Sequence, residues 1–162
     1  TARLKSQLKE KNIMDIQEIS DKLEINEVLI AYATAIDSKD YQQLDSVFSK
    51  EAAIDFTEVG GPSGDLKTIY AYLEEALAKF PRTQHMLGNP VIKLEGDKAT
   101  SKTMCHNPMV LLNDSGEEEA FFIGLWYLDN LSRTSDGWRI KKRKLELCYV
   151  YDQPEQLNIG NQ

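Results

Sequence analysis

The sequence predicts an α+β fold in which about three N-terminal helices pack on one face of a curved antiparallel sheet. Two patterns support this prediction. Apolar residues recur at three- and four-residue steps in the first half, whereas long β-type segments separated by short turns follow Pro81. Helices gathered at the start and strands gathered at the end are typical of α+β proteins, not of the alternating α/β class.

The expected elements follow from these patterns and from capping residues. In the first half they are a long helix at 13–36 that can break near Ser20, a short helix at 41–48 capped by Asp40, a strand at 52–59 and a helix at 66–80 capped by Asp65. In the second half they are strands at 85–94, 99–112, 118–132 and 138–151. Four consecutive strands linked by short turns predict antiparallel pairing.

Composition indicates one ordinary folded domain. The chain has 162 residues, 41% of them hydrophobic and 28% charged, with only 9 Gly and 5 Pro. A single domain usually has about 100–200 residues, and this composition disfavours disordered and fibrous proteins. We therefore expect one domain over residues 1–162, with a core at about 13–151 and terminal extensions at 1–12 and 152–162.

Charge and hydropathy narrow the class of partners. The chain carries 19 Lys and Arg against 26 Asp and Glu, a net charge of −7. An acidic chain repels nucleic-acid phosphates and anionic lipids, so we expect neither nucleic acid nor membrane as a partner. The longest apolar runs, such as residues 120–128, are shorter than the roughly 20 residues needed to span a bilayer, and residues 1–12 are too polar for a secretory signal. We expect a cytoplasmic protein.

Motifs for metals and cofactors are missing from the sequence. Cys105 and Cys148 lie in different segments, form no CxxC and have no histidine at ligand spacing near both, so we expect reduced thiols and no metal. The chain contains none of the patterns GxGxxG, GxxxxGK[ST], GxSxG and HExxH. Any activity is expected to be cofactor-free.

Asp37 and His85 form a candidate acid–base pair. His85 begins a predicted strand just after a helix, where side chains can point between helices and sheet. Asp37 follows an apolar helix end, where a carboxylate is costly unless it has a partner. A carboxylate bonded to one ring nitrogen of histidine fixes the tautomer and raises the basicity of the ring. In the alternative interpretations, His85 caps backbone groups at the strand start and Asp37 is an ordinary polar residue at a helix end.

Three further residues have two interpretations each. Tyr32 can donate a hydrogen bond to a substrate oxygen, or it can be a core tyrosine with a satisfied hydroxyl. His106 lies on a predicted strand, and a bulge at Pro108 would decide whether it faces a pocket. Arg143 belongs to a basic segment whose alternation indicates a solvated face, yet Arg143 can point inward and orient an anionic or carbonyl substrate.

Several segments resemble a known family. Residues 36–41, the strand residues 53–56 and above all the segment Arg82-Thr-Gln-His85 with the following Met-Leu-Gly88 are similar to segments of the scytalone dehydratase family. The order of helices and strands resembles the SnoaL-like branch of the NTF2-like (cystatin-like) superfamily. The resemblance implies a cone that encloses a deep apolar pocket, a small apolar organic substrate, and assembly as homotrimers or homodimers.

The resemblance also implies roles for residues. It makes Asp37 and His85 the catalytic dyad, assisted by Tyr32, and it places Phe56, Asn107 and Met109 at substrate-binding positions, to which the residues themselves add His106 and Arg143. The family has pocket tyrosines where this chain has Ile36 and Phe56, and a second pocket histidine where it has Met109. Scytalone itself is therefore not the expected substrate.

The expected function is a cofactor-free lyase of the dehydratase type. It would eliminate water or another small leaving group from an apolar cyclic or polyketide-like carbonyl compound. The same dyad would also serve an isomerase or a cyclase, and the fold also serves non-catalytic binding modules. A hydrogen bond between Asp37 and His85 at the base of a closed pocket would favour an enzyme.

Overall fold

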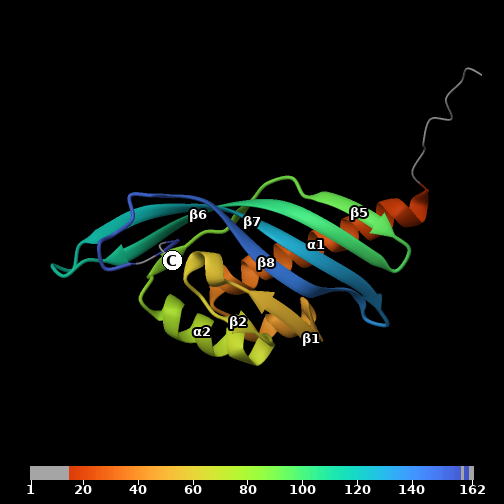
Figure 1. Ribbon diagram of the computed structural model, residues 1–162, viewed down its shortest axis with the longest axis horizontal. Coiled ribbons are helices and arrows are strands. Elements are labelled where there is room, and N and C mark those ends of the chain that lie inside the picture. Colours follow the sequence, from red (N-terminus) through yellow and green to blue (C-terminus); the bar gives the residue numbers. More distant parts are fainter. Residues whose placement is uncertain (1–14, 158, 161–162) are drawn as a thin grey trace, which may run out of the picture.

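The computed structural model describes residues 15–157, 159 and 160, which form helices packed on an eight-stranded sheet (Figure 1). The helices are α1 (Ile16–Ser38), the 3-10 helices η1 (Tyr41–Ser46) and η2 (Thr57–Val59), and α2 (Leu66–Ala78). The strands are β1 (Phe48–Asp55), β2 (Ser63–Gly64), β3 (Arg82–Thr83), β4 (Met86–Leu87), β5 (Val91–Glu95), β6 (Lys98–Leu112), β7 (Glu118–Thr134) and β8 (Gly137–Tyr151).

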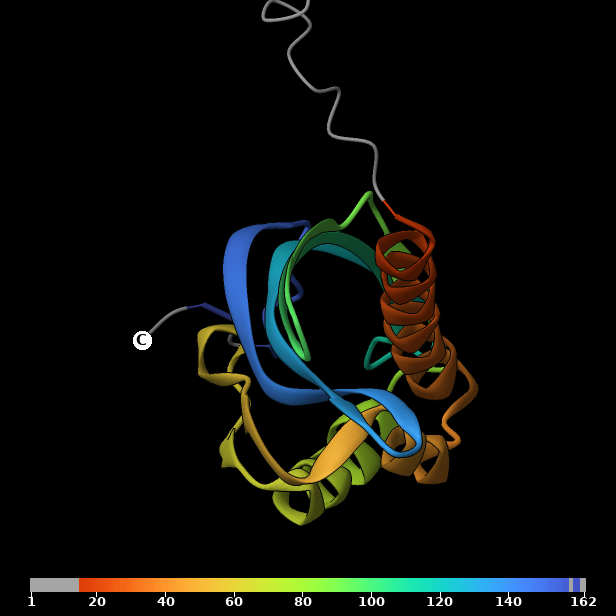
Figure 2. The same cartoon turned by 90° about the vertical axis from the view of Figure 1, so that its right-hand side faces the viewer.

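The sheet is strongly curved and the helices cover its concave side. Neighbouring strands follow the order β2-β1-β8-β7-β6-β3, and β4 and β5 also pair with β6. Figure 2 shows α1 running along the open side of the curved sheet, with α2 beside β1. Buried residues of the helices, such as Leu29 and Leu73, pack with inward-facing strand residues such as Leu125. The predicted α+β class, with helices on a curved sheet, is confirmed.

Helix α1 places Asp37 at its last turn. The Asp15 side chain accepts a hydrogen bond from the Glu18 backbone N–H at 2.7 Å and caps the helix start. The helix continues through Ser20, so the break allowed for there does not occur. It ends at Lys39, whose left-handed φ of 56° turns the chain away. Asp37 therefore sits at the end of a rigid element that faces the sheet.

The segment after α1 differs from the prediction. Residues 41–46 form a 3-10 helix, and Phe48 already belongs to β1, where it pairs with Ile140 of β8. This pairing is parallel, the one parallel contact among the described strands. Strand β1 ends at Asp55 because the Asp55 carboxylate accepts hydrogen bonds from the N–H and hydroxyl of Thr57 and turns the chain. The sheet is therefore mixed at this edge.

The predicted strand at 85–94 is broken into short pieces. Strands β3, β4 and β5 each pair with β6, but His85 falls between β3 and β4. Pro90, which has no N–H to donate, separates β4 from β5. The His85 backbone N–H is therefore free of the ladder and donates instead to Asp37 Oδ2 at 2.8 Å. This interruption positions the candidate site.

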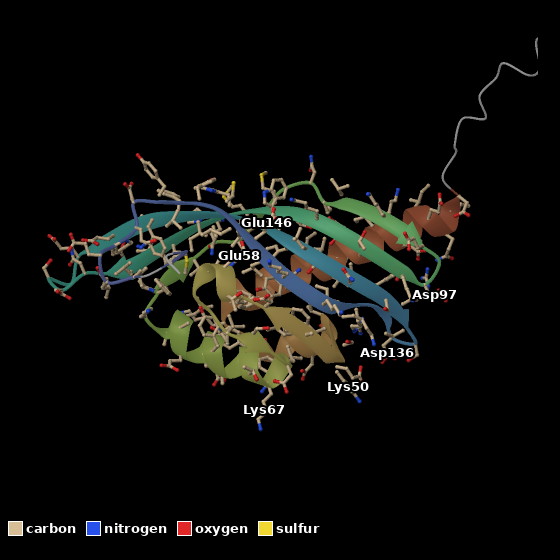
Figure 3. The ribbon with its side chains drawn as sticks, viewed as in Figure 1. Lys50, Glu58, Lys67, Asp97, Asp136 and Glu146 are labelled. Atoms are coloured by element: carbon tan, nitrogen blue, oxygen red, sulfur yellow. The ribbon has the colours of Figure 1, made fainter. Side chains whose placement is uncertain are left out.

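Charged side chains such as those of Lys50, Lys67 and Asp136 project outward from the fold (Figure 3). The described part of the chain contains no helix long and apolar enough to cross a bilayer.

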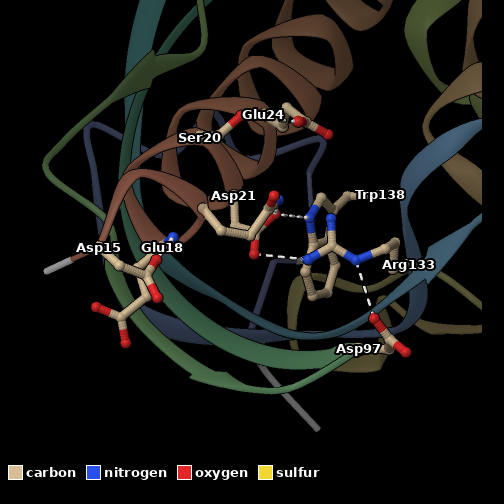
Figure 4. A network of polar contacts seen from close by, with 9 residues as sticks. Asp15, Glu18, Ser20, Asp21, Glu24, Asp97, Arg133 and Trp138 are labelled. Carbon is tan, nitrogen blue, oxygen red and sulfur yellow. Dashed lines mark hydrogen bonds and ion pairs between the residues drawn. The ribbon is translucent and has the colours of Figure 1, made fainter.

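A polar cluster anchors the start of α1 to the far end of the sheet (Figure 4). The Asp21 carboxylate accepts hydrogen bonds from Arg133 at 2.6 Å and from the Trp138 indole at 3.2 Å. Arg133 also donates to Asp97 at 2.9 Å. The bond from Arg133 lowers the pKa of Asp21 to about 2, so the carboxylate stays ionised at ordinary pH. Helix α1 is thus held to the sheet near both of its ends.

Candidate active site

A cavity of about 250 Å³ lies between the helices and the concave side of the sheet. Most of its wall is apolar, with contributions from Ile36, Phe56, Leu73, Leu77, Phe80, Met109, Ile123, Leu125 and Leu145. The polar side chains on the wall are those of Tyr32, Tyr72, Lys79, His85, Asn107 and Tyr127. A mostly apolar cavity with a few polar groups is typical of small-molecule sites.

His85 lies on the wall of this cavity, and Asp37 pairs with it from outside the lining. His85 Nδ1 lies 2.6 Å from Asp37 Oδ1, and the Thr83 hydroxyl donates to the same oxygen at 2.9 Å. The His85 backbone N–H donates to Oδ2, so both oxygens of the Asp37 carboxylate accept hydrogen bonds. The His85 side chain is 8% exposed and that of Asp37 is 26% exposed. The structure brings together the two residues that the sequence predicts as a pair.

These contacts determine which nitrogen of His85 is free. Burial pushes the pKa of Asp37 up, but hydrogen bonds from the His85 ring, the His85 backbone and Thr83 lower the pKa below its usual value. An ionised carboxylate is an acceptor only, so the 2.6 Å contact places the proton of a neutral His85 on Nδ1. Nε2 then carries a lone pair that can accept a proton.

Asn107 contacts the free nitrogen of His85. Its Nδ2 lies 3.2 Å from His85 Nε2, and its Oδ1 is buried with no hydrogen-bond partner among the described residues. The amide can donate to Nε2 while the ring is neutral. If the amide group rotates by half a turn, its Oδ1 can accept a hydrogen bond from Nε2–H once the ring is protonated. Asn107 thus suits both protonation states of the ring.

Three other residues proposed for the site also line the cavity. Tyr32 comes from α1, Phe56 follows β1, and Met109 comes from the inward face of β6. All three are almost fully buried.

The structure corrects the expectation for His106. Strands β6 and β7 pair without a register shift around Pro108, so alternation continues and His106 faces away from Asn107. The His106 ring stacks on Phe122 at 5.6 Å, and its Nδ1 lies 3.0 Å from the Tyr149 hydroxyl. His106 is on the outer face of the sheet and not on the cavity wall.

The structure also corrects the expectation for Arg143. Its side chain points inward, but it is fully buried and makes two hydrogen bonds of 2.8 Å to Asp129. Its guanidinium lies beneath the rings of Tyr32 and Tyr127 and is not part of the cavity wall. Because a desolvated guanidinium requires a carboxylate, Arg143 is held by Asp129 and not by substrate.

Sequence reasoning missed Thr83 and Tyr127. Thr83 supports Asp37, and its position two residues before His85 in an extended segment is the signal that could have found it. Tyr127 lies two residues from both Leu125 and Asp129, so all three side chains point to the inward face of β7. The alternation of the strand therefore indicates a position inside the fold.

The comparisons with known proteins agree with this architecture. The sequence model of a protein family described as the SnoaL-like domain matches residues 17–144. The chain belongs to the SnoaL-like domain family. An uncharacterized protein of Mycobacterium tuberculosis is 41% identical over 140 residues, covering 86% of this chain and 94% of that protein.

Solved structures place the chain in the same fold. A putative scytalone dehydratase from Novosphingobium aromaticivorans has a TM-score of 0.77 at 15% identity, over 91% of this chain and 97% of that chain. A hexachlorocyclohexane dehydrochlorinase has a TM-score of 0.72 at 14% identity, over 89% of this chain and all of that chain (100%). The SnoaL-like family that the sequence resembles and the cystatin-like fold that it predicts are confirmed. At these identities the two structures show the fold alone.

Proposed function

We propose that the protein is a cofactor-free lyase that eliminates water or another small leaving group from an apolar cyclic or polyketide-like carbonyl compound. The observation that supports this proposal most is the 2.6 Å contact between Asp37 and Nδ1 of His85, a residue that lines a largely apolar cavity. The family and the fold support the broader class of small-molecule binding or lyase and isomerase chemistry.

The dyad would act as a general base. Nε2 of neutral His85 takes a proton from the carbon next to the substrate carbonyl, while Asp37 stabilises the imidazolium through Nδ1. The electron pair of the broken C–H bond first moves to the carbonyl oxygen as an enolate. It then forms the C=C bond while the C–O bond of the leaving hydroxyl breaks, and the protonated His85 gives its proton to that hydroxyl in the same step, so that water leaves.

The other polar groups have supporting tasks in this scheme. Asn107 must move off Nε2 when the substrate arrives, which its single contact of 3.2 Å permits. Tyr32 donates a hydrogen bond to a substrate oxygen. A substrate that fills the largely apolar cavity displaces water from it, which strengthens each of these interactions.

The size of the cavity restricts the substrate. Its volume of about 250 Å³ lies just below the roughly 300–1,000 Å³ of most small-molecule pockets. We therefore propose a compact substrate of one or two rings.

The test is a screen of compact cyclic β-hydroxy ketones in D₂O. Elimination produces a conjugated enone, which is followed by its ultraviolet absorbance, and proton abstraction is followed as deuterium uptake next to the carbonyl by mass spectrometry. We expect the enone to form with at least one ketone of the panel. Deuterium uptake without elimination would instead indicate an isomerase or cyclase, and neither signal with ketones that do bind would indicate a binding module.

A further inference from the structure

Two buried tyrosines line the cavity together with His85. Tyr32 comes from α1 and Tyr127 from β7, and the residues are only 3% and 2% exposed. Their rings meet edge to face, with centroids 5.4 Å apart. The Tyr127 hydroxyl has the Cys105 thiol as a hydrogen-bond partner, and sulfur is a weak partner that a substrate oxygen can replace.

A buried cation supports both rings. The guanidinium carbon of Arg143 lies 4.0 Å from the ring centre of Tyr32 and 4.3 Å from that of Tyr127. Asp129 holds Nε and Nη2 of this guanidinium, whereas Nη1 has no hydrogen-bond partner among the described residues. The positive group is therefore fixed against the two phenol rings.

The phenols remain protonated in this environment. Burial raises the pKa of Tyr32 to about 12, and burial also raises the pKa of Tyr127 well above its usual value. Arg143 lowers the pKa of Tyr32, and this effect is larger than the rise caused by Asp129. Both side chains thus offer O–H groups at any ordinary pH.

From this placement we infer that Tyr127 and Tyr32 form a donor pair for the carbonyl oxygen of the substrate, which gains negative charge as His85 removes the neighbouring proton. The inference rests on the proposed function and assigns the groups that bind the carbonyl of its substrate. Hydrogen-bond donors placed where charge develops are worth most in a dry site. The donor pair favours compounds that pass through an enolate and gives no help to elimination from halogenated hydrocarbons without a carbonyl.

A phenolate that resembles an enolate tests the donor pair without turnover. 4-Nitrophenol is titrated by absorbance in the presence and absence of saturating protein, in the wild type and in His85→Ala, which removes the imidazole charge. We expect the bound chromophore to ionise at least one pH unit lower than the free one in both proteins. This shift means a tenfold preference for the ionised form.

Substitutions locate the effect. Tyr127→Phe and Tyr32→Phe are each expected to reduce the preference at least fivefold. Tyr70→Phe is the control, because it removes a tyrosine hydroxyl outside the cavity that donates to Asp45 at 2.8 Å, and it should keep the full preference. Unfolding temperatures show that each variant is folded.

The possible failures can be told apart. If the wild type binds both forms equally or binds neither, or if Tyr127→Phe and Tyr32→Phe both keep the full preference, the donor pair is overturned. Elimination that continues in that case leaves the lyase proposal standing. A phenolate preference without any elimination or deuterium uptake supports the donor pair and counts against the lyase.

Discussion

His85→Ala and Asp37→Asn are each expected to slow proton removal from the substrate by about 10²–10⁴-fold, the usual contribution of general acid–base catalysis. His85→Ala removes the base. Asp37→Asn replaces the acceptor 2.6 Å from Nδ1 by an amide that can donate its N–H to Nδ1, which favours the tautomer with the proton on Nε2. Deuterium uptake and enone formation measure both effects, and circular dichroism checks the fold.

His106→Ala is the matched control for these two variants. It removes the other histidine of the chain, which lies on the outer face of the sheet against Phe122. Its rates should equal those of the wild type. Full activity in either dyad variant would remove the proposed mechanism.

Asp129→Ala is expected to lower the free energy of unfolding by about 3–5 kcal/mol, because it leaves a fully buried guanidinium without its carboxylate. Urea denaturation measures the loss. Glu146→Ala is the control, since it breaks a bond of 2.9 Å to Lys102 between two half-exposed side chains on the outside of the sheet (Figure 3). Exposed pairs contribute about 0–1 kcal/mol, so this variant should barely change stability.

A double variant separates charge from volume at the same place. Arg143→Met with Asp129→Leu removes both charges and keeps apolar bulk, so most of the lost stability should return. If Asp129→Ala alone costs less than about 1 kcal/mol, the guanidinium is not held as tightly as its two hydrogen bonds indicate.

The elements that local patterns could predict are those with long apolar periods. The helix that ends near Asp37 and the three long strands of the second half lie within a few residues of their expected bounds. Non-local pairing explains what local patterns miss. The parallel contact of β1 with β8 joins residues as far apart in the chain as Phe48 and Ile140. The interruption around His85 depends on Asp37, an acceptor from another element.

The candidate site also contains residues that local sequence signals indicate and residues whose roles depend on strand pairing. A carboxylate at an apolar helix end and a histidine at a strand start are local signals, and they are sufficient to indicate Asp37 and His85. The expected role of Arg143 in orienting a substrate is wrong, because Arg143 is paired with Asp129 on the neighbouring strand. Without the strand register, the sequence does not show which acidic residue pairs with which basic residue. The orientation of His106 depends on whether a bulge forms at Pro108, and the regular pairing of β6 with β7 shows that the strand continues unbroken there.

In the proposed mechanism, Asp37 holds the proton of neutral His85 on Nδ1 and leaves Nε2 free as the base. Nitrogen-15 NMR of the histidine rings tests this directly, in the wild type and in Asp37→Asn, at a pH where the rings are neutral. We predict a protonated Nδ1 and an unprotonated Nε2 for wild-type His85, and loss of this preference in the variant, with His106 unchanged. A wild-type His85 protonated on Nε2, or a tautomer that does not change with the substitution, would contradict the proposed role of Asp37.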